Sequence, residues 1–171
     1  PDIEKFNLIA HSQGGLTSRY VMSVRPDLVA SVTTLGSPHQ GAPIADVLND
    51  VFPEDSFLGG SFEAVSTAVG TLIDMLSGDA SGADVRALTE EFTTAGIASF
   101  NESYPAGLPT TDCGEGPQSV PLNGHDIRLY SWAGTDTLTN VADPLDYLFG
   151  TTGLLFSNEA SDGITGRCSS H

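Results

Sequence analysis

The amino-terminal part of the chain reads Phe6-Asn7-Leu8-Ile9-Ala10-His11-Ser12-Gln13-Gly14-Gly15. Its apolar run, residues 6–10, is typical of a strand buried in a parallel sheet. After the glycine pair, apolar residues recur at helical spacing as far as Pro26, and a run rich in β-branched residues follows at positions 29–35. A strand, a sharp turn, a helix and a second strand form a βαβ unit, so the sequence predicts an α/β fold.

The turn between this strand and the helix has the small-x-Ser-x-small pattern of a nucleophile elbow. In such an elbow the strained backbone pushes the serine hydroxyl out over the edge of the sheet, and the residues two places before and after the serine approach closely. Ala10 and Gly14 are small enough for this approach. We therefore expect Ser12 to be a catalytic nucleophile and the backbone N–H of Gln13 to donate to a developing oxyanion. The alternative is a serine that only caps a helix.

In this type of fold the nucleophile is followed along the chain by an acid and then by a histidine. Asp162, in a Ser-Asp-Gly-Ile segment, is the candidate acid, and an ordinary Asp-Gly turn is the alternative on local sequence alone. His11 directly precedes the serine, so it is expected to pack or hydrogen-bond rather than to act as the base. The one histidine after Asp162 is His171, at the end of the chain.

The composition limits the classes of partner. The chain has 171 residues, with 6 Lys and Arg against 22 Asp and Glu, which gives a formal net charge of −16. We expect no binding to nucleic acid, because this charge would repel phosphate backbones. No apolar stretch is long enough to span a membrane. The length by itself favours a single domain.

Other segments carry weaker structural predictions. Residues 61–78 have a one-sided apolar stripe, which is typical of an amphipathic helix. The tail after residue 157 is polar and rich in turn residues. We further expect a helix over residues 84–99, a long loop over residues 101–123 that carries Cys113, a strand over residues 127–133 and a helix start at Asp143-Pro144.

Several of these motifs occur together in a known family. They are residues 7–15, Ser18-Arg19-Tyr20, residues 32–41, Cys113-Gly114-Glu115-Gly116, Tyr130-Ser131-Trp132 and residues 162–171. Because it combines these motifs, the chain resembles the secreted bacterial lipases of the Pseudomonas and Burkholderia type, which are calcium-dependent triacylglycerol hydrolases with the α/β-hydrolase fold. The resemblance covers essentially the whole chain.

The resemblance implies a Ser-Asp-His triad that acts through an acyl-enzyme, with Ser12 as nucleophile, Asp162 as acid and the Gln13 N–H as one oxyanion donor. It also implies a single disulfide between Cys113 and Cys168. Without the resemblance, the two cysteines fit either one disulfide or two unrelated thiols.

The catalytic histidine of this family lies in a His-Leu-Asp segment downstream of the Cys-Ser-Ser-His motif, so His171 is not expected to be catalytic. Residues 1–171 are then expected to be a central fragment. It is a partial α/β-hydrolase domain that lacks the first sheet strands and the histidine-bearing segment. Such a fragment is expected to be inactive and unstable on its own.

The same resemblance implies a structural calcium ion with Asp143 as one ligand. A single carboxylate does not make a site for an ion that takes six to eight oxygen ligands, so we expect this chain alone to bind calcium weakly or not at all. Asp126, Asp136 and Asp146 lack the spacing of a calcium-binding loop and are expected to be solvated.

Residues 43–80 are expected to form a mobile lid, whose apolar face covers the site in water and meets a lipid–water interface. A plain core helix is the alternative for the apolar stripe. The resemblance further implies secretion and a dedicated membrane-anchored foldase as partner. A short-chain esterase or acyltransferase of the same fold, and a non-catalytic acidic secreted module, are the alternatives to a triacylglycerol lipase.

Overall fold

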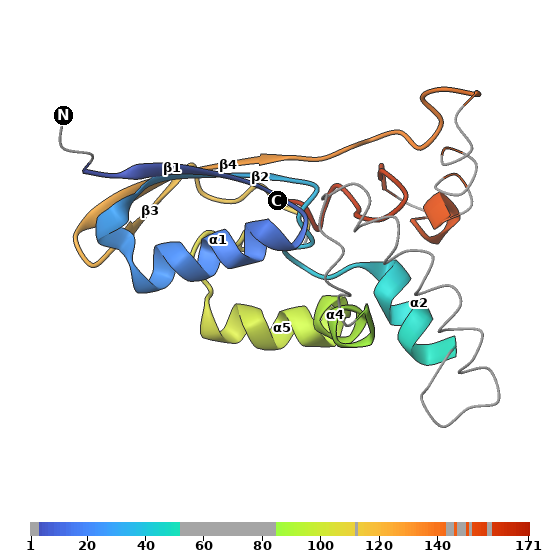
Figure 1. The fold of residues 1–171 in the computed structure, drawn as a ribbon, viewed down its shortest axis with the longest axis horizontal. Helices are drawn as coiled ribbons and strands as arrows, with labels where there is room; N and C mark the ends of the chain where they lie inside the picture. The colour runs from blue at the N-terminus through green and yellow to red at the C-terminus, as the bar shows by residue number, and fades with distance from the viewer. Residues whose placement is uncertain are drawn as a thin grey trace.

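The computed structural model describes residues 4–51, 85–111, 113–142, 146, 150, 152–156 and 159–171. Its centre is a four-stranded sheet in the order β1-β2-β4-β3 (Figure 1). Three strands run parallel, namely β1 (Phe6–His11), β2 (Val29–Leu35) and β4 (His125–Trp132). Strand β3 (Ser119–Leu122) pairs antiparallel with β4. This mixed sheet with its helices confirms the predicted α/β class.

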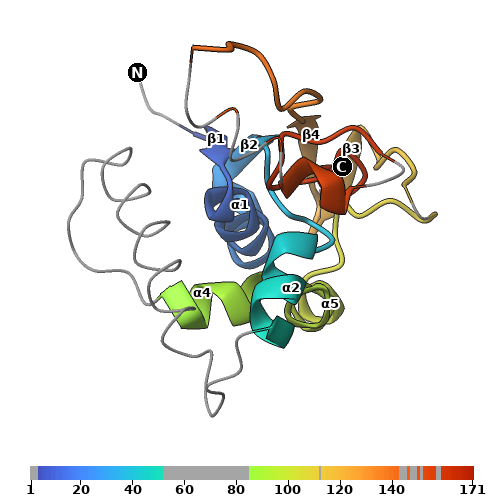
Figure 2. The same ribbon diagram turned by 90° about the vertical axis from the view of Figure 1, so that its right-hand side faces the viewer.

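Helix α1 (Gln13–Val24) lies directly against one face of the sheet. Helices α4 (Val85–Phe92) and α5 (Thr94–Ser103) lie beyond α1 on the same side, as both views show (Figures 1 and 2). Helix α2 (Pro43–Val51) packs against α4. Short 3₁₀ helices, η1 (Pro26–Leu28) and η2 (Gly153–Leu155), complete the helical structure of the described residues, in which no helix is long and apolar enough to cross a membrane.

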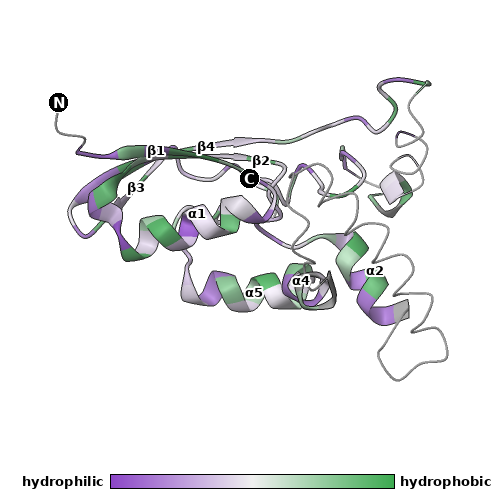
Figure 3. Ribbon diagram, viewed as in Figure 1, coloured by the Kyte–Doolittle hydropathy of each residue, from purple (hydrophilic) through white to green (hydrophobic). Residues whose placement is uncertain are grey.

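The core lies between α1 and the sheet. Met22 of α1, Val29 and Val32 of β2 and Ile127 of β4 are each at most 2% exposed. Full burial of such a side chain contributes about 1.5–3 kcal/mol to folding, so these four residues hold α1 to the two central strands. Figure 3 shows in green that hydrophobic residues occur along the strands and on α1.

The opposite face of the sheet carries large apolar side chains that the described residues leave exposed. The exposed fraction is 75% for Ile9, 51% for Tyr130 and 68% for Trp132. No described helix lies on this side of the sheet in Figure 1.

The single helix predicted over residues 84–99 is wrong, because the chain breaks at Thr93 into α4 and α5. The Thr93 hydroxyl accepts a hydrogen bond from the N–H of Gly96 at 3.0 Å and so caps a new helix. A Cβ atom at Gly96 would lie 2.5 Å from the carbonyl oxygen of Glu90, so this tight corner requires glycine.

The long loop predicted over residues 101–123 is also too long. Helix α5 continues into it as far as Ser103, and β3 forms near its end. Asn123 and Gly124, with φ of 49° and 82°, make a two-residue turn that pairs Leu122 with His125. An Asn-Gly pair between strands is a strong hairpin signal, and it is present in the sequence.

The remaining predictions have mixed outcomes. The helix before Pro26 and the strand at residues 29–35 are confirmed, and residues 159–171 form turns around one isolated bridge between Ser161 and Gly166. Helix α2 occupies the start of the expected lid region, where the sequence analysis placed no defined helix. The predicted helix at residues 61–78 and the helix start at Asp143 lie outside the described residues.

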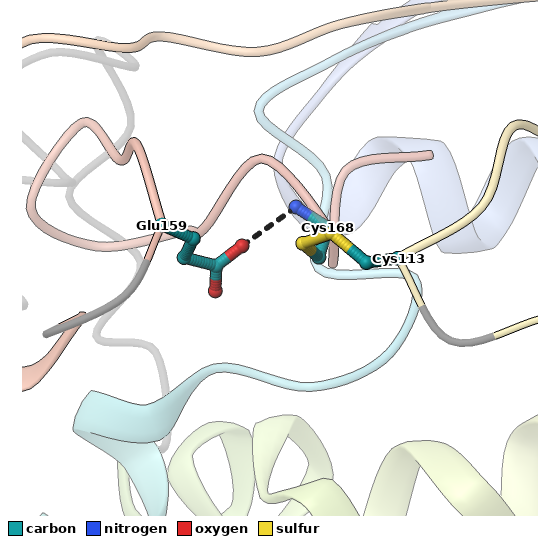
Figure 4. A group of neighbouring side chains, drawn as sticks. All are labelled: Cys113, Glu159 and Cys168. Carbon is teal, nitrogen blue, oxygen red and sulfur yellow. Dashed lines mark hydrogen bonds between the residues drawn. A yellow bond between two sulfur atoms is a disulfide. The ribbon is translucent and has the colours of Figure 1, made fainter.

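Cys113 and Cys168, 55 residues apart in sequence, form a disulfide (Figure 4). The pairing implied by the resemblance is therefore confirmed. The bond ties the loop that follows α5 to the carboxyl-terminal tail.

Replacing both cysteines with serine should lower the free energy of unfolding by up to about 4 kcal/mol. The reason is that a cross-link closing a loop of this length restricts the unfolded chain. Urea unfolding followed by circular dichroism measures the change. The wild-type protein reduced with dithiothreitol is the control and should unfold at the same urea concentration as the double variant. A variant as stable as the oxidised wild type would contradict this expectation.

Candidate active site

Ser12 lies at the tip of the turn between β1 and α1. Its backbone has φ 54° and ψ −128°, a conformation that non-glycine residues rarely adopt and that costs about 1–3 kcal/mol. The N–H of Ser12 donates to the carbonyl oxygen of Leu35 at 3.0 Å, which ties the turn to the end of β2. This is the strained strand-to-helix turn that a nucleophile elbow requires.

Close packing explains the small residues around this turn. A Cβ atom at Gly14 would lie 3.2 Å from the Cβ of Ala10, which is the close approach expected from the sequence. A Cβ atom at Gly15 would lie 2.1 Å from the Oγ of Ser37, far inside van der Waals contact. The first turn of α1 therefore packs against the chain after β2 with no room for a side chain at Gly15.

Helix α1 begins at Gln13, whose backbone N–H is among the first four of the helix and has no acceptor within it. This N–H directly follows Ser12 in the chain. The Gln13 side chain is engaged elsewhere, because its Nε2 donates to Oε2 of Glu91 in α4 at 3.3 Å. A cavity of about 190 Å³ opens beside these residues, and it is lined by Gln13, Leu16, Thr17, Tyr20, Glu91, Ile97 and Phe100.

Asp162 lies at the carboxyl edge of the same sheet. Its Oδ1 accepts hydrogen bonds from the N–H groups of Ile164 at 2.9 Å and Thr165 at 2.7 Å, which fix the orientation of the carboxyl group. Its Oδ2 is 3.4 Å from the point where a Cβ of Gly36, just after β2, would lie. A Cβ of Gly134, just after β4, would lie 2.6 Å from the Cβ of Asp162. The two predicted triad residues thus lie at one edge, Ser12 after β1 and Asp162 beside the ends of β2 and β4.

His11, next to Ser12 in sequence, and His171, which follows Asp162, have different surroundings. His11 ends β1 with an exposed side chain, and its Nε2 is 3.9 Å from the point where a Cβ of Gly36 would lie. His171 borders another cavity, of about 200 Å³, together with Arg19, Thr34 and His39. Within the described residues, neither histidine forms a hydrogen bond with Ser12 or Asp162.

Arg19 is a buried cation next to the site whose role the sequence analysis did not identify. Its side chain is 5% exposed and donates to Oδ1 of Asn101 at 2.9 Å and to the carbonyl oxygen of Tyr104. Its guanidinium lies over the ring of Phe100, 5.2 Å from the centroid. Burial lowers the pKa of Arg19 to about 10, so the side chain is still charged at neutral pH. The arginine holds α5 against α1.

His39 is the second buried polar residue that sequence reasoning missed. It is 5% exposed, and its Nε2 is 3.1 Å from Oγ1 of Thr34. Its carbonyl oxygen accepts from Nδ2 of Asn101 at 2.8 Å. Burial, with a smaller effect of the charge on Arg19, lowers the pKa of His39 to about 3, so the imidazole is neutral in the folded protein.

The segment after β2 is docked on the carboxyl-terminal tail. The backbone N–H of His39 donates to the carbonyl oxygen of Ser169 at 2.8 Å, and Nε2 of Gln40 donates to that of Cys168 at 3.1 Å. The N–H of Cys168 in turn donates to Oε2 of Glu159 at 2.8 Å (Figure 4). These contacts anchor the tail that carries Asp162.

The described residues do not fit a calcium site. Their single group of neighbouring metal-ligand atoms comes from Cys113, Glu159 and Cys168 (Figure 4). The two sulfur atoms of this group are joined to each other, which leaves one carboxylate for an ion that takes six to eight oxygens. Asp143, the expected ligand, lies outside the described residues.

The prediction that Asp146 is solvated is wrong. Its side chain is 8% exposed, and Oδ2 accepts hydrogen bonds from the N–H and hydroxyl of Thr139 and from the N–H of Asn140. The carboxylate therefore organises the preceding loop. Asp126 and Asp136 are exposed, as expected.

Comparison with known proteins first defines the class. A family model described as alpha/beta hydrolase fold matches residues 2–74. The structure is similar to the mature form of Bacillus licheniformis lipase BlEst2, with a TM-score of 0.58, 17% identity and coverage of 98% of this chain and 53% of that one. The chain has the α/β-hydrolase fold, of which it represents a part.

Sequence relatives narrow this class. A triacylglycerol lipase of Vibrio cholerae is 47% identical over 169 residues, covering 98% of this chain and 53% of the relative. Triacylglycerol lipases of Burkholderia plantarii and Pseudomonas fragi are 40% and 35% identical, with 54% and 59% of each relative covered. The predicted resemblance is therefore confirmed. The chain spans about half the length of the curated relatives it matches.

The buried His39 makes stability depend on pH. Its pKa is about 3 in the folded protein against about 6.5 in the unfolded chain, so only the unfolded chain binds the proton between these values. The free energy of unfolding should therefore fall as pH drops from 6.5 towards 3, by at most about 1.4 kcal/mol per pH unit from this group. Urea unfolding of the wild type and of His39→Gln at several pH values measures the slope. An equal slope in both proteins would show that another group is responsible.

Proposed function

We propose that the chain is the nucleophile-bearing part of a secreted triacylglycerol lipase in which Ser12 attacks the ester. The observation that carries this proposal is the strained backbone of Ser12 at the strand-to-helix turn, with Asp162 at the same edge of the sheet. The similarity to bacterial triacylglycerol lipases supports the substrate class.

In the proposed reaction, Oγ of Ser12 bonds to the ester carbonyl carbon and its proton passes to a histidine base. The carbonyl oxygen becomes an oxyanion, to which the N–H of Gln13 donates a hydrogen bond that is stronger in the transition state than in the ground state. The C–O bond to the alcohol then breaks, and the protonated histidine gives its proton to the leaving oxygen. Water hydrolyses the acyl-enzyme by the same steps and releases the fatty acid.

Asp162 has the role of holding the histidine in this reaction. Its Oδ1 is occupied by two backbone N–H groups, so Oδ2 is the oxygen that accepts the hydrogen bond from the imidazole. We assign the base to a histidine outside residues 1–171, because among the described residues His11 and His171 form no hydrogen bond with Ser12 or Asp162.

The proposal extends to the surroundings of the enzyme. The disulfide fits an oxidising compartment and supports secretion. Residues 43–80 would form the lid that meets the lipid–water interface, and a dedicated foldase would assist export. The lid and the foldase both rest on the similarity to the family.

Calcium would be structural, with Asp143 as one ligand and the other oxygens from residues outside the described part. No step of the reaction uses it.

Labelling with a fluorophosphonate tests the nucleophile directly. In the full-length protein, we expect one adduct on Ser12, identified by mass spectrometry of the tryptic peptide. Ser12→Ala should abolish labelling and lower kcat for triacylglycerol hydrolysis by about 10⁴-fold or more, as expected when a triad nucleophile is removed.

Val24→Ala is a matched control on the same helix, since Val24 is 47% exposed at the far end of α1 and lies outside the proposed machinery. This variant should be labelled by the fluorophosphonate and should hydrolyse triacylglycerol as the wild type does. An intact protein that gives no adduct on Ser12 would favour a non-catalytic module. Efficient labelling with hydrolysis of short-chain esters only would favour a short-chain esterase.

A further inference from the structure

Asp162 reaches the site from a tail that follows β4 by some thirty residues, so its position is not set by the strand itself. We propose that Gly134 is a positioning residue for the acid: the absence of a side chain there lets Asp162 lie against the end of β4. This inference rests on the proposed function, because it assumes that Asp162 orients the catalytic histidine.

Asp162 lies so close to Gly134 that no side chain fits at position 134. A Cβ atom at Gly134 would lie 2.6 Å from the Cβ, 3.5 Å from Oδ2 and 3.6 Å from the Cα of Asp162. Cβ atoms in proteins essentially never approach a heavy atom within 3.0 Å, so an added methyl group forces Asp162 or the chain at position 134 to shift.

No other observed feature requires glycine at this position. The backbone of Gly134 lies outside the left-handed region, so an L-residue can adopt its conformation. Gly134 is exposed, and among the described residues the three heavy atoms nearest to an added Cβ, its chain neighbours apart, all belong to Asp162. The close approach of the acid is thus the physical reason for glycine here.

Asp162 has little freedom to yield without changing its geometry. Its Oδ1 is held by the N–H groups of Ile164 and Thr165, and the hydroxyl of Thr165 donates to the carbonyl oxygen of Gly36 at 3.4 Å. Displacement from β4 therefore strains these hydrogen bonds and moves Oδ2, the oxygen proposed to accept from the histidine.

Two kinetic consequences follow from such a displacement. A misplaced carboxylate orients the imidazole poorly, and a misplacement of about 1 Å can cost about 10²-fold in rate. A carboxylate that lies farther away also stabilises the imidazolium less, so the pKa of the histidine falls. General loss of stability would produce neither an altered pH profile nor a change confined to kcat.

The test is Gly134→Ala in the full-length protein, assayed on a soluble p-nitrophenyl ester. We expect kcat to fall about 10- to 100-fold with KM nearly unchanged, and the acid limb of the kcat/KM profile to move to lower pH. Gly150→Ala is the matched control, because among the described residues its added Cβ meets Leu138 alone, at 3.8 Å, which is an ordinary contact. It should keep the wild-type kcat and pH profile.

A double-mutant cycle keeps the inference separate from the proposed function. If Gly134 acts through Asp162, then Gly134→Ala should have almost no further effect in an Asp162→Asn background. An inactive Asp162→Asn variant together with a fully active Gly134→Ala variant would overturn the positioning role alone. An Asp162→Asn variant with wild-type kcat would overturn the proposed triad. Equal fold-losses from Gly134→Ala in both backgrounds would show that Gly134 acts independently of the acid.

Discussion

The unfavourable backbone conformation of Ser12 is the constraint on which the arrangement of the site depends. An isolated turn would leave this conformation, because no local interaction offsets its strain of about 1–3 kcal/mol. The pairing of β1 with β2, the hydrogen bond from Ser12 to Leu35 and the packing of Gly15 against Ser37 hold it in place. The turn is thus held at the sheet edge by interactions with a neighbouring strand, and α1 starts directly after Ser12.

A second set of interactions joins the elements around this turn through buried polar groups. Asn101 is at its centre, since it accepts from Arg19 of α1 and donates to the carbonyl oxygen of His39. The segment that carries His39 is in turn hydrogen-bonded to Ser169 in the disulfide-linked tail. Removing one partner from such a network leaves a buried donor or charge unpaired, which costs more than the bond itself contributes. The site is therefore supported by sequence-distant residues that act together.

Local patterns were sufficient to predict the βαβ unit and the nucleophile turn, because the strand, turn and helix are contiguous and each has its own signal. The break at Thr93 was missed, since apolar spacing continues across it and only the capping hydrogen bond to Gly96 reveals it. Asp162 was recognisable as an acid in the expected order, but its contact with Gly134 depends on a tail folding back over β4. The burial of Arg19 and His39 likewise depends on tertiary packing. It was not predictable from residue type, because arginine is seldom buried and histidine only sometimes. The hairpin at Asn123-Gly124 was predictable from its turn chemistry.

Trp132, the single tryptophan of the chain, ends β4 two residues before Gly134 and is 68% exposed on the face of the sheet that no described helix covers. An indole in this position emits as a solvated chromophore, and any segment that packs on that face removes it from water. The protein thus contains an intrinsic optical probe at the edge of the sheet where Ser12 and Asp162 lie. Its emission wavelength distinguishes a bare sheet from a covered one without the addition of any label.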